Sequence, residues 1–120
     1  MRLFIGIALV LVSAQAHAAD SWSNADLMRQ GIFTAVEIID WGQTRYLAKH
    51  PDRYHEINPF LGQHPSVGRV DTLFSVSLVA NAGVTWVLPA RYRPYWQWGR
   101  IGIEAGLIAH NARIGIRMDF

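Results

Sequence analysis

The chain has 120 residues, a net charge of +2 and no cysteine, so it forms one domain at most, without disulfides or a thiolate metal site. Hydrophobic residues make up 51% of the sequence and charged residues only 17%, whereas about 25% of the residues in an average soluble domain are charged. The small net charge and the scattered basic residues argue against nucleic-acid binding. This composition favours a membrane protein and leaves a compact soluble domain as the alternative.

The first 19 residues have the three parts of a secretory signal peptide. Arg2 precedes an apolar run over residues 3–12, and residues 16–18 (Ala-His-Ala) form a small-x-small cleavage box. We therefore expect residues 1–19 to be a signal peptide and the mature chain to start at residue 19 or 20. The alternative is an uncleaved anchor helix, although a full membrane span needs about 20 apolar residues.

The first predicted helix runs from about residue 24 to 49. Ser23 or Asn24 can cap its start, and His50 leaves the helical conformation because Pro51 follows it. At about 100° per residue, its polar side chains fall on one narrow stripe: Asp26, Gln30, Glu37, Asp40 and Thr44. Such a stripe is typical of a helix that faces lipid and turns its polar line toward partner helices. A wet face on a small soluble bundle is the alternative.

Two further apolar segments follow, over about 66–88 and 94–113. Ser66 can cap the second segment, Pro89 ends it, and its length suits a membrane span. Pro94 suits the first position of the third helix. Gly102 and Gly106 lie four residues apart there, a spacing that lets helices approach closely in lipid, so we expect a homo-oligomer or a membrane partner protein on this face.

Together these segments predict an all-α fold. We expect a small helical membrane bundle with three transmembrane helices after the signal sequence, in a single domain over residues 20–120. The lipid bilayer is then the main partner, and no nucleic acid is expected.

Aromatic and basic residues favour the inner (cytoplasmic) membrane. Six aromatic residues cluster at the segment ends as in an interfacial belt: Tyr46, Trp86, Tyr92, Tyr95, Trp96 and Trp98. The loop after the first helix and the carboxyl tail carry Arg45, Lys49, Arg53, Arg69, Arg113 and Arg117. The positive-inside rule places these segments in the cytoplasm and the amino end outside. Arg91 and Arg93, in the outer turn, count against this orientation.

Three spans would bring Glu37, Asn81 and Glu104 to a similar depth near the bilayer centre. A carboxylate at that depth costs at least a few kcal/mol, so these side chains should face inward and find partners. Two neighbouring carboxylates cannot both stay ionised cheaply, so one would be protonated, paired with Arg100 or bound to a cation. The ligand or ion candidates are Glu37, Asp40, Asn81, Arg100, Glu104, His110 and Asn111, and Asp40 with His110 is the pair for proton transfer or metal binding.

Two interpretations of this polar layer stay open. In the first, Arg100 pairs with Glu104 and the polar groups only join the helices, which gives a structural, assembly or envelope role. In the second, the layer handles a proton, an ion or a small ligand. No catalytic residue, cofactor or metal site is predicted, and the sequence leans against an enzyme.

The central loop predicts a structural motif at Glu56, Asn58 and Pro59. Asn58 suits a cap, Pro59 suits the first helical position, and Gly62 ends one short turn, with Glu56 accepting hydrogen bonds from free backbone amides. The loop histidines His50, His55 and His64 match no standard zinc spacing, so we expect them to be solvated or interfacial.

One pattern resembles a known group of proteins. Asp40-x3-Thr44, followed by Glu56-x-Asn58-Pro59 and two apolar segments, is similar to small uncharacterised bacterial and phage helical membrane proteins. The resemblance covers a small part of the chain. It implies a helical membrane fold and carries over no catalytic role.

The carboxyl end gives a competing interpretation. Ile114, Ile116, Met118 and Phe120 alternate along the chain, and an exported protein with such a final strand and a terminal Phe resembles outer-membrane β-barrel proteins. The mature chain hardly suffices for eight strands of roughly ten residues with their turns. An outer-membrane barrel is therefore the alternative fold and location.

Overall fold

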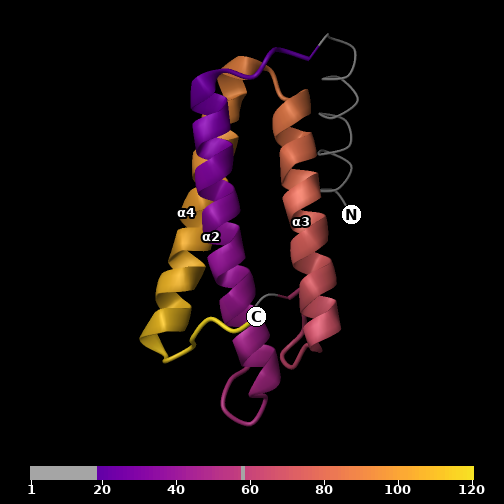
Figure 1. The fold of residues 1–120 in the computed structure, drawn as a ribbon, viewed down its shortest axis with the longest axis vertical. Helices are drawn as coiled ribbons and strands as arrows, with labels where there is room; N and C mark the ends of the chain where they lie inside the picture. The colour runs from indigo at the N-terminus through magenta and orange to yellow at the C-terminus, as the bar shows by residue number, and fades with distance from the viewer. Residues whose placement is uncertain (1–18, 58) are drawn as a thin grey trace.

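The computed structural model describes residues 19–57 and 59–120, so the expected signal peptide and Asn58 lie outside the described residues. The described part contains α2 (Asn24–Lys49), α3 (Val67–Val87), the 3-10 turn η1 (Ala90–Tyr92) and α4 (Arg93–Arg113). The three helices form a bundle in which α2 lies against both α3 and α4, and α3 runs antiparallel to the other two (Figure 1). The expected all-α fold is confirmed, and these residues contain no strand.

Local signals set the limits of each helix. At the start of α2, Ser23 Oγ accepts from the Asp26 N–H at 3.0 Å, and Asp26 Oδ2 accepts from the Ser23 N–H at 3.0 Å. At the start of α3, Ser66 Oγ accepts from the Arg69 N–H at 3.1 Å. Proline follows α2 and α3 closely, and Pro94 occupies the first turn of α4, where its missing N–H costs nothing.

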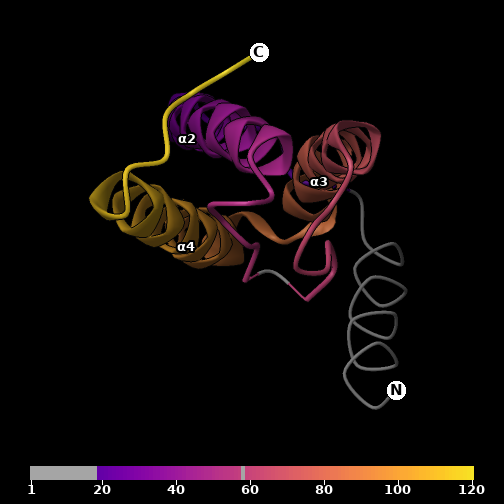
Figure 2. The same cartoon turned by 90° about the horizontal axis from the view of Figure 1, so that it is seen from below.

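The tail after α4 returns across α2. Gly115, with φ +91°, makes the left-handed turn that ends α4, and the buried Ile116 donates its N–H to the Asn111 carbonyl at 2.9 Å. The Asp119 N–H then reaches the Gly42 carbonyl at 3.0 Å. This tail therefore lies along the outer side of α2 and belongs to no sheet, in contrast to the barrel strand that its alternation suggested (Figure 2).

Polarity is inverted between the inside and the outside of the bundle. Among the described residues, eleven polar or charged residues are buried, against seven hydrophobic ones. Large apolar side chains face outward from all three helices: Leu27, Met28, Ile38, Val76, Val79, Trp86, Tyr95, Trp98 and Ile103. Charged residues in soluble proteins are almost never buried unless paired. This arrangement therefore differs from that of an ordinary soluble bundle.

Within the described part, α3 alone is long and apolar enough to cross a membrane, judged by length and composition. Its 21 residues extend about 31 Å, which matches a hydrocarbon core of about 30 Å. The helices α2 and α4 do not meet this criterion, so it does not support the expected three transmembrane helices.

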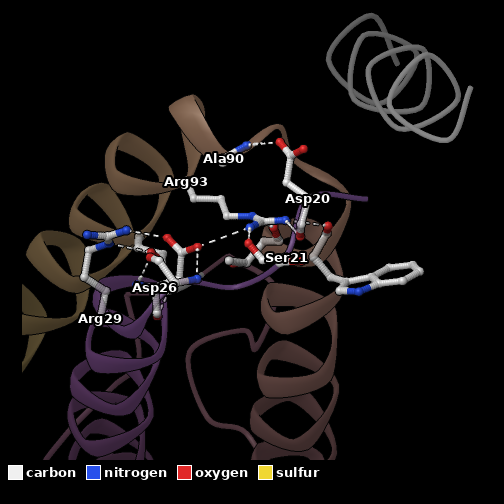
Figure 3. A network of polar contacts seen from close by, with 10 residues as sticks. Asp20, Ser21, Asp26, Arg29, Ala90 and Arg93 are labelled. Atoms are coloured by element: carbon white, nitrogen blue, oxygen red, sulfur yellow. Dashed lines mark hydrogen bonds and ion pairs between the residues drawn. The ribbon is translucent and has the colours of Figure 1, made fainter. Parts of the chain in front are cut away.

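One buried cation joins the three helices at the end of the bundle where α4 begins (Figure 3). The side chain of Arg93 is 0% exposed. Its Nε donates to the Thr85 carbonyl at 2.8 Å and its Nη2 to the Trp86 carbonyl at 3.2 Å. These carbonyls belong to the last turn of α3, which has no helical partners for them.

The other Arg93 donors hold the segment that leads into α2. Nη2 donates to the Asp20 carbonyl at 2.7 Å, and Nη1 donates to the Ser21 carbonyl and the Asp26 carboxylate, each at 3.1 Å. All five N–H groups of the guanidinium therefore have an acceptor. The cation lies at the carboxyl end of α3, and Asp26 lies in the first turn of α2. The dipoles of these two helices therefore stabilise both charges.

Asp26 extends this network to α4. Its carboxylate also accepts from Arg29, its carbonyl accepts from Gln97 Nε2 at 3.0 Å, and Arg29 Nε donates to Gln97 Oε1 at 2.6 Å. We call Asp26, Arg29, Arg93 and Gln97 the arginine layer. Every charged group in it has a partner of opposite charge.

Replacing Arg93 with Met removes the cation and leaves Asp26 and the end of α3 without their donor. We expect the free energy of unfolding in mild detergent to fall by about 3–5 kcal/mol, the usual loss when one partner of a buried ion pair is removed. Arg91→Met is the matched control, since Arg91 is exposed in the adjacent turn, and its effect should stay within about 0.5 kcal/mol. Equal losses in the two variants would contradict the central role of Arg93.

Candidate functional site

A cavity of about 430 Å³ opens between α3 and α4, with residues of α2 at its base. Glu37 and Asp40 come from α2, Ser77 from α3, and Arg100 and Glu104 from α4. Its other walls are apolar. They consist of Ile57, Pro59 and Phe60 of the loop that crosses from α2 to α3, Leu73 and Phe74 of α3, and Ile103 and Leu107 of α4. Figure 2 shows this loop passing beside α3 and α4 on the side away from α2.

Helical spacing brings the polar residues together. Glu37 and Asp40 are three residues apart on the polar stripe of α2, and Arg100 and Glu104 are four apart on α4, so each pair projects from one helix face. Because α2 and α4 pack directly on each other, the two faces meet in the bundle interior. The polar stripe of α2 is thus turned inward.

Three carboxyl groups meet at the base of the cavity. Glu37 is 1% and Glu104 is 5% exposed, and the Glu104 carboxyl lies close to those of both Glu37 and Asp40. Ser77 lies beside Glu37, and Arg100 Nη2 donates to Glu104 Oε1 at 3.2 Å. We call Glu37, Asp40 and Glu104 the acid cluster.

The acid cluster is incompletely neutralised. Arg100 can balance one of the three carboxylates, whereas the nearby Arg45 is paired with Asp71. The Oε2 atoms of Glu37 and Glu104 are buried without a donor among the described groups. Neighbouring buried carboxyls beside one arginine cannot all stay ionised cheaply, so the cluster calls for a proton or a positively charged ligand.

The partner of Asp40 differs from the expected one. Asn111 Nδ2 donates to Asp40 Oδ1 at 3.3 Å and to Gln43 Oε1 at 3.2 Å. His110 is exposed, because one residue along a helix turns the side chain by about 100°. The expected pair of Asp40 and His110 is therefore not formed, and Asn111 takes that place.

Asn81 does not line the cavity. It is 3% exposed, and neither its amide nitrogen nor its amide oxygen has a partner within the described part of the chain. Ser77, one turn earlier on the same face of α3, is the residue that reaches Glu37. Of the seven expected residues, the cavity brings together Glu37, Asp40, Arg100 and Glu104.

The described residues of the loop motif are Glu56 and Pro59, and Pro59 lines the cavity. Glu56 Oε1 accepts from the Ile57 N–H at 3.0 Å, and the Glu56 N–H donates to the Gln63 carbonyl at 2.7 Å. Residues 59–61 form a turn that Gly62 ends with φ +77°, a conformation that favours glycine. Arg69 Nη2 donates to the Phe60 carbonyl at 3.0 Å and so ties this wall to α3.

The loop histidines do not form a metal centre with other described residues. No group of three or more His, Asp or Glu side chains in the described ranges has an arrangement that could hold a metal ion. His50 stacks on the Tyr46 ring at 4.1 Å between centroids and lies 2.7 Å from the Tyr46 carbonyl through Nδ1.

The burial of Arg29, Arg93 and Gln97 was not expected from the sequence. The spacing of Arg29 three residues after Asp26 is a local signal for that ion pair. No comparable signal exists for Arg93, because its partners outside α3 lie 67 to 73 positions away.

The chain matches no protein-family model, no curated protein and no solved structure. The resemblance to small bacterial and phage membrane proteins therefore stays a prediction. The function has to be argued from the site.

Arg100 and Glu104 form a pair whose coupling can be measured. Arg100→Gln leaves the acid cluster without its cation, and we expect the free energy of unfolding in detergent to fall by about 1–3 kcal/mol. Glu104→Gln alone should cost less than about 1 kcal/mol, because the amide keeps the hydrogen bonds and removes one negative charge.

The double variant Arg100→Gln/Glu104→Gln should recover most of the loss caused by Arg100→Gln. If the double variant is as unstable as the sum of both single variants, the two groups are not coupled and the charge balance described above is wrong.

Proposed function

We propose that this is a protein of the inner membrane in which α2, α3 and α4 all span the bilayer and the acid cluster takes up protons or binds a small ligand. Support for the three spans comes from the charge on the helix surfaces. No Asp, Glu, Lys or Arg is exposed over residues 24–48, 70–87 or 93–112. The charged side chains that remain partly exposed along these stretches are paired: Arg45 with Asp71, and Arg100 with Glu104.

The inward position of the charges explains why α2 and α4 are less apolar overall than α3. The mean hydropathy of a helix does not depend on which way its side chains point. Asp26, Glu37 and Asp40 of α2 are buried, as are Arg93 and Glu104 of α4. Charged residues of membrane helices face the bundle interior, as these do.

The exposed charges lie toward the two ends of the bundle. Five exposed basic residues belong to the end that carries the central loop and the tail: Lys49, Arg53, Arg69, Arg113 and Arg117. The positive-inside rule then places this end in the cytoplasm. Arg93, which counted against this orientation, is buried and paired with Asp26. Of the two arginines in the outer turn, Arg91 is the one that is exposed.

The acid cluster carries the functional part of the proposal. In a polar layer that only holds helices together, the polar groups find their hydrogen-bond partners within the layer. The guanidinium of Arg93 in the arginine layer does so. The acid cluster has more negative than positive groups, two oxygens without a donor, and a cavity beside it. That difference between two layers of one bundle favours binding of a proton or cation over a purely structural role.

Assembly is the second candidate role. Gly102 and Gly106 are exposed on α4, and a Cβ atom at either position would meet nothing within 4 Å. This leaves room for a second helix at close range, which favours a homo-oligomer or a membrane partner on that face.

The three spans can be tested with single cysteines, because the chain has none of its own. A membrane-impermeant maleimide should leave Val79→Cys unmodified in intact membranes, since this 75% exposed side chain would face lipid. Arg91→Cys should react from the periplasm, and Arg117→Cys only in inverted vesicles. Fast reaction of Val79→Cys from water, with the fold retained, would contradict the membrane-spanning arrangement.

The acid cluster can be tested with dicyclohexylcarbodiimide, an apolar reagent that couples to protonated carboxyl groups. In inner-membrane vesicles we expect it to modify Glu37 or Glu104, as identified by the masses of proteolytic peptides. The double variant Glu37→Gln/Glu104→Gln should lose the modification, whereas Asp52→Asn, a change at an exposed loop acid, should keep it. Absence of modification in the wild type would contradict the proposed role.

A further inference from the structure

We infer that the cavity takes an amphipathic organic cation, an ammonium or phosphonium group carried on an apolar body. This inference rests on the proposed function and names the class of ligand for the same site.

The base of the cavity selects the sign of the charge. Glu37, Asp40 and Glu104 face a single cation, Arg100, which is already bonded to Glu104. The buried Oε2 atoms of Glu37 and Glu104 have no donor within the described part of the chain. A positive group placed there would compensate the surplus carboxyls, whereas a phosphate or carboxylate would add to the repulsion.

The walls select the rest of the ligand. Leu73 and Phe74 of α3, Ile103 and Leu107 of α4 and Phe60 of the loop give the cavity an apolar lining. A bare proton or an inorganic cation needs oxygen ligands and no apolar space. A volume of about 430 Å³ with mostly apolar walls lies in the range of pockets that hold a small organic molecule.

The depth of each group gives the orientation of the ligand. The carboxyl groups lie at the buried base, while Ile103 is 56% and Phe60 is 67% exposed at the rim. A cation entering from the bilayer would place its charge on the acids and keep its apolar body against these rim residues and the lipid. The aromatic rings of Phe60 and Phe74 could also stabilise a cation that is stripped of water.

The experiment measures binding of tetraphenylphosphonium to the purified full-length protein in detergent by equilibrium dialysis. We expect saturable binding, at least about tenfold tighter than that of the neutral triphenylphosphine oxide. The variant Glu37→Gln/Glu104→Gln should bind tetraphenylphosphonium at least about tenfold more weakly, and Asp52→Asn should bind it as the wild type does. Circular dichroism checks that each variant keeps its helices.

A second pair of variants tests the apolar wall. Ile103→Ala shortens a rim residue of the cavity and should weaken binding several-fold. Val79→Ala makes a comparable change on a surface outside the cavity and should leave binding unchanged. Equal effects of the two substitutions, or equal binding of the neutral oxide, would overturn the inference, because the probe would then only partition into apolar surface.

Protection from dicyclohexylcarbodiimide separates this inference from the proposed function. Slower modification of the acid cluster in the presence of tetraphenylphosphonium supports both. Modification that tetraphenylphosphonium does not slow overturns the organic ligand and leaves the proton role standing. If the acids are never modified and no probe binds, both fail.

Discussion

The guanidinium of Arg93 is the group on which the rest of the bundle depends. It belongs to the first residue of α4, and its five N–H groups donate to acceptors at the end of α3 and at the entry and first turn of α2. A buried cation tolerates such a position only when it is fully paired, because an unpaired charge away from water costs several kcal/mol. The positions of the three helix ends relative to one another are thus set by one side chain and its partner Asp26.

The two polar layers of the bundle have opposite character. In the arginine layer both arginines are bonded to Asp26 and the end of α3 is satisfied, which gives rigidity. In the acid cluster three carboxyls share one arginine beside a cavity, so the layer is complete only with a proton or a cation. The arginine layer holds one end of the bundle in place, so a ligand can bind at the acid cluster without loss of the fold.

The inverted distribution of polarity gives both layers a common physical cause. In lipid, apolar side chains gain nothing by turning inward, so polar contacts and close packing hold helices together. The proposed membrane location therefore accounts for buried Asp, Glu and Arg beside exposed Val, Ile and Trp. The same location makes an unbalanced acid cluster costly, which is the reason to assign it a function.

The sequence by itself determined the all-α fold and the polar stripe of α2. These depend on local chemistry: serine caps at Ser23 and Ser66, proline at the helix ends, and a 3.6-residue period. Only the tertiary structure decided that Asn111 and not His110 meets Asp40, that Ser77 and not Asn81 meets Glu37, and that Arg93 is buried. These outcomes depend on the rotation and axial offset of each helix, which are set by contacts between residues up to 73 positions apart. The cavity has the same origin, because its acids and its apolar walls come from four separate segments that meet only when the bundle forms.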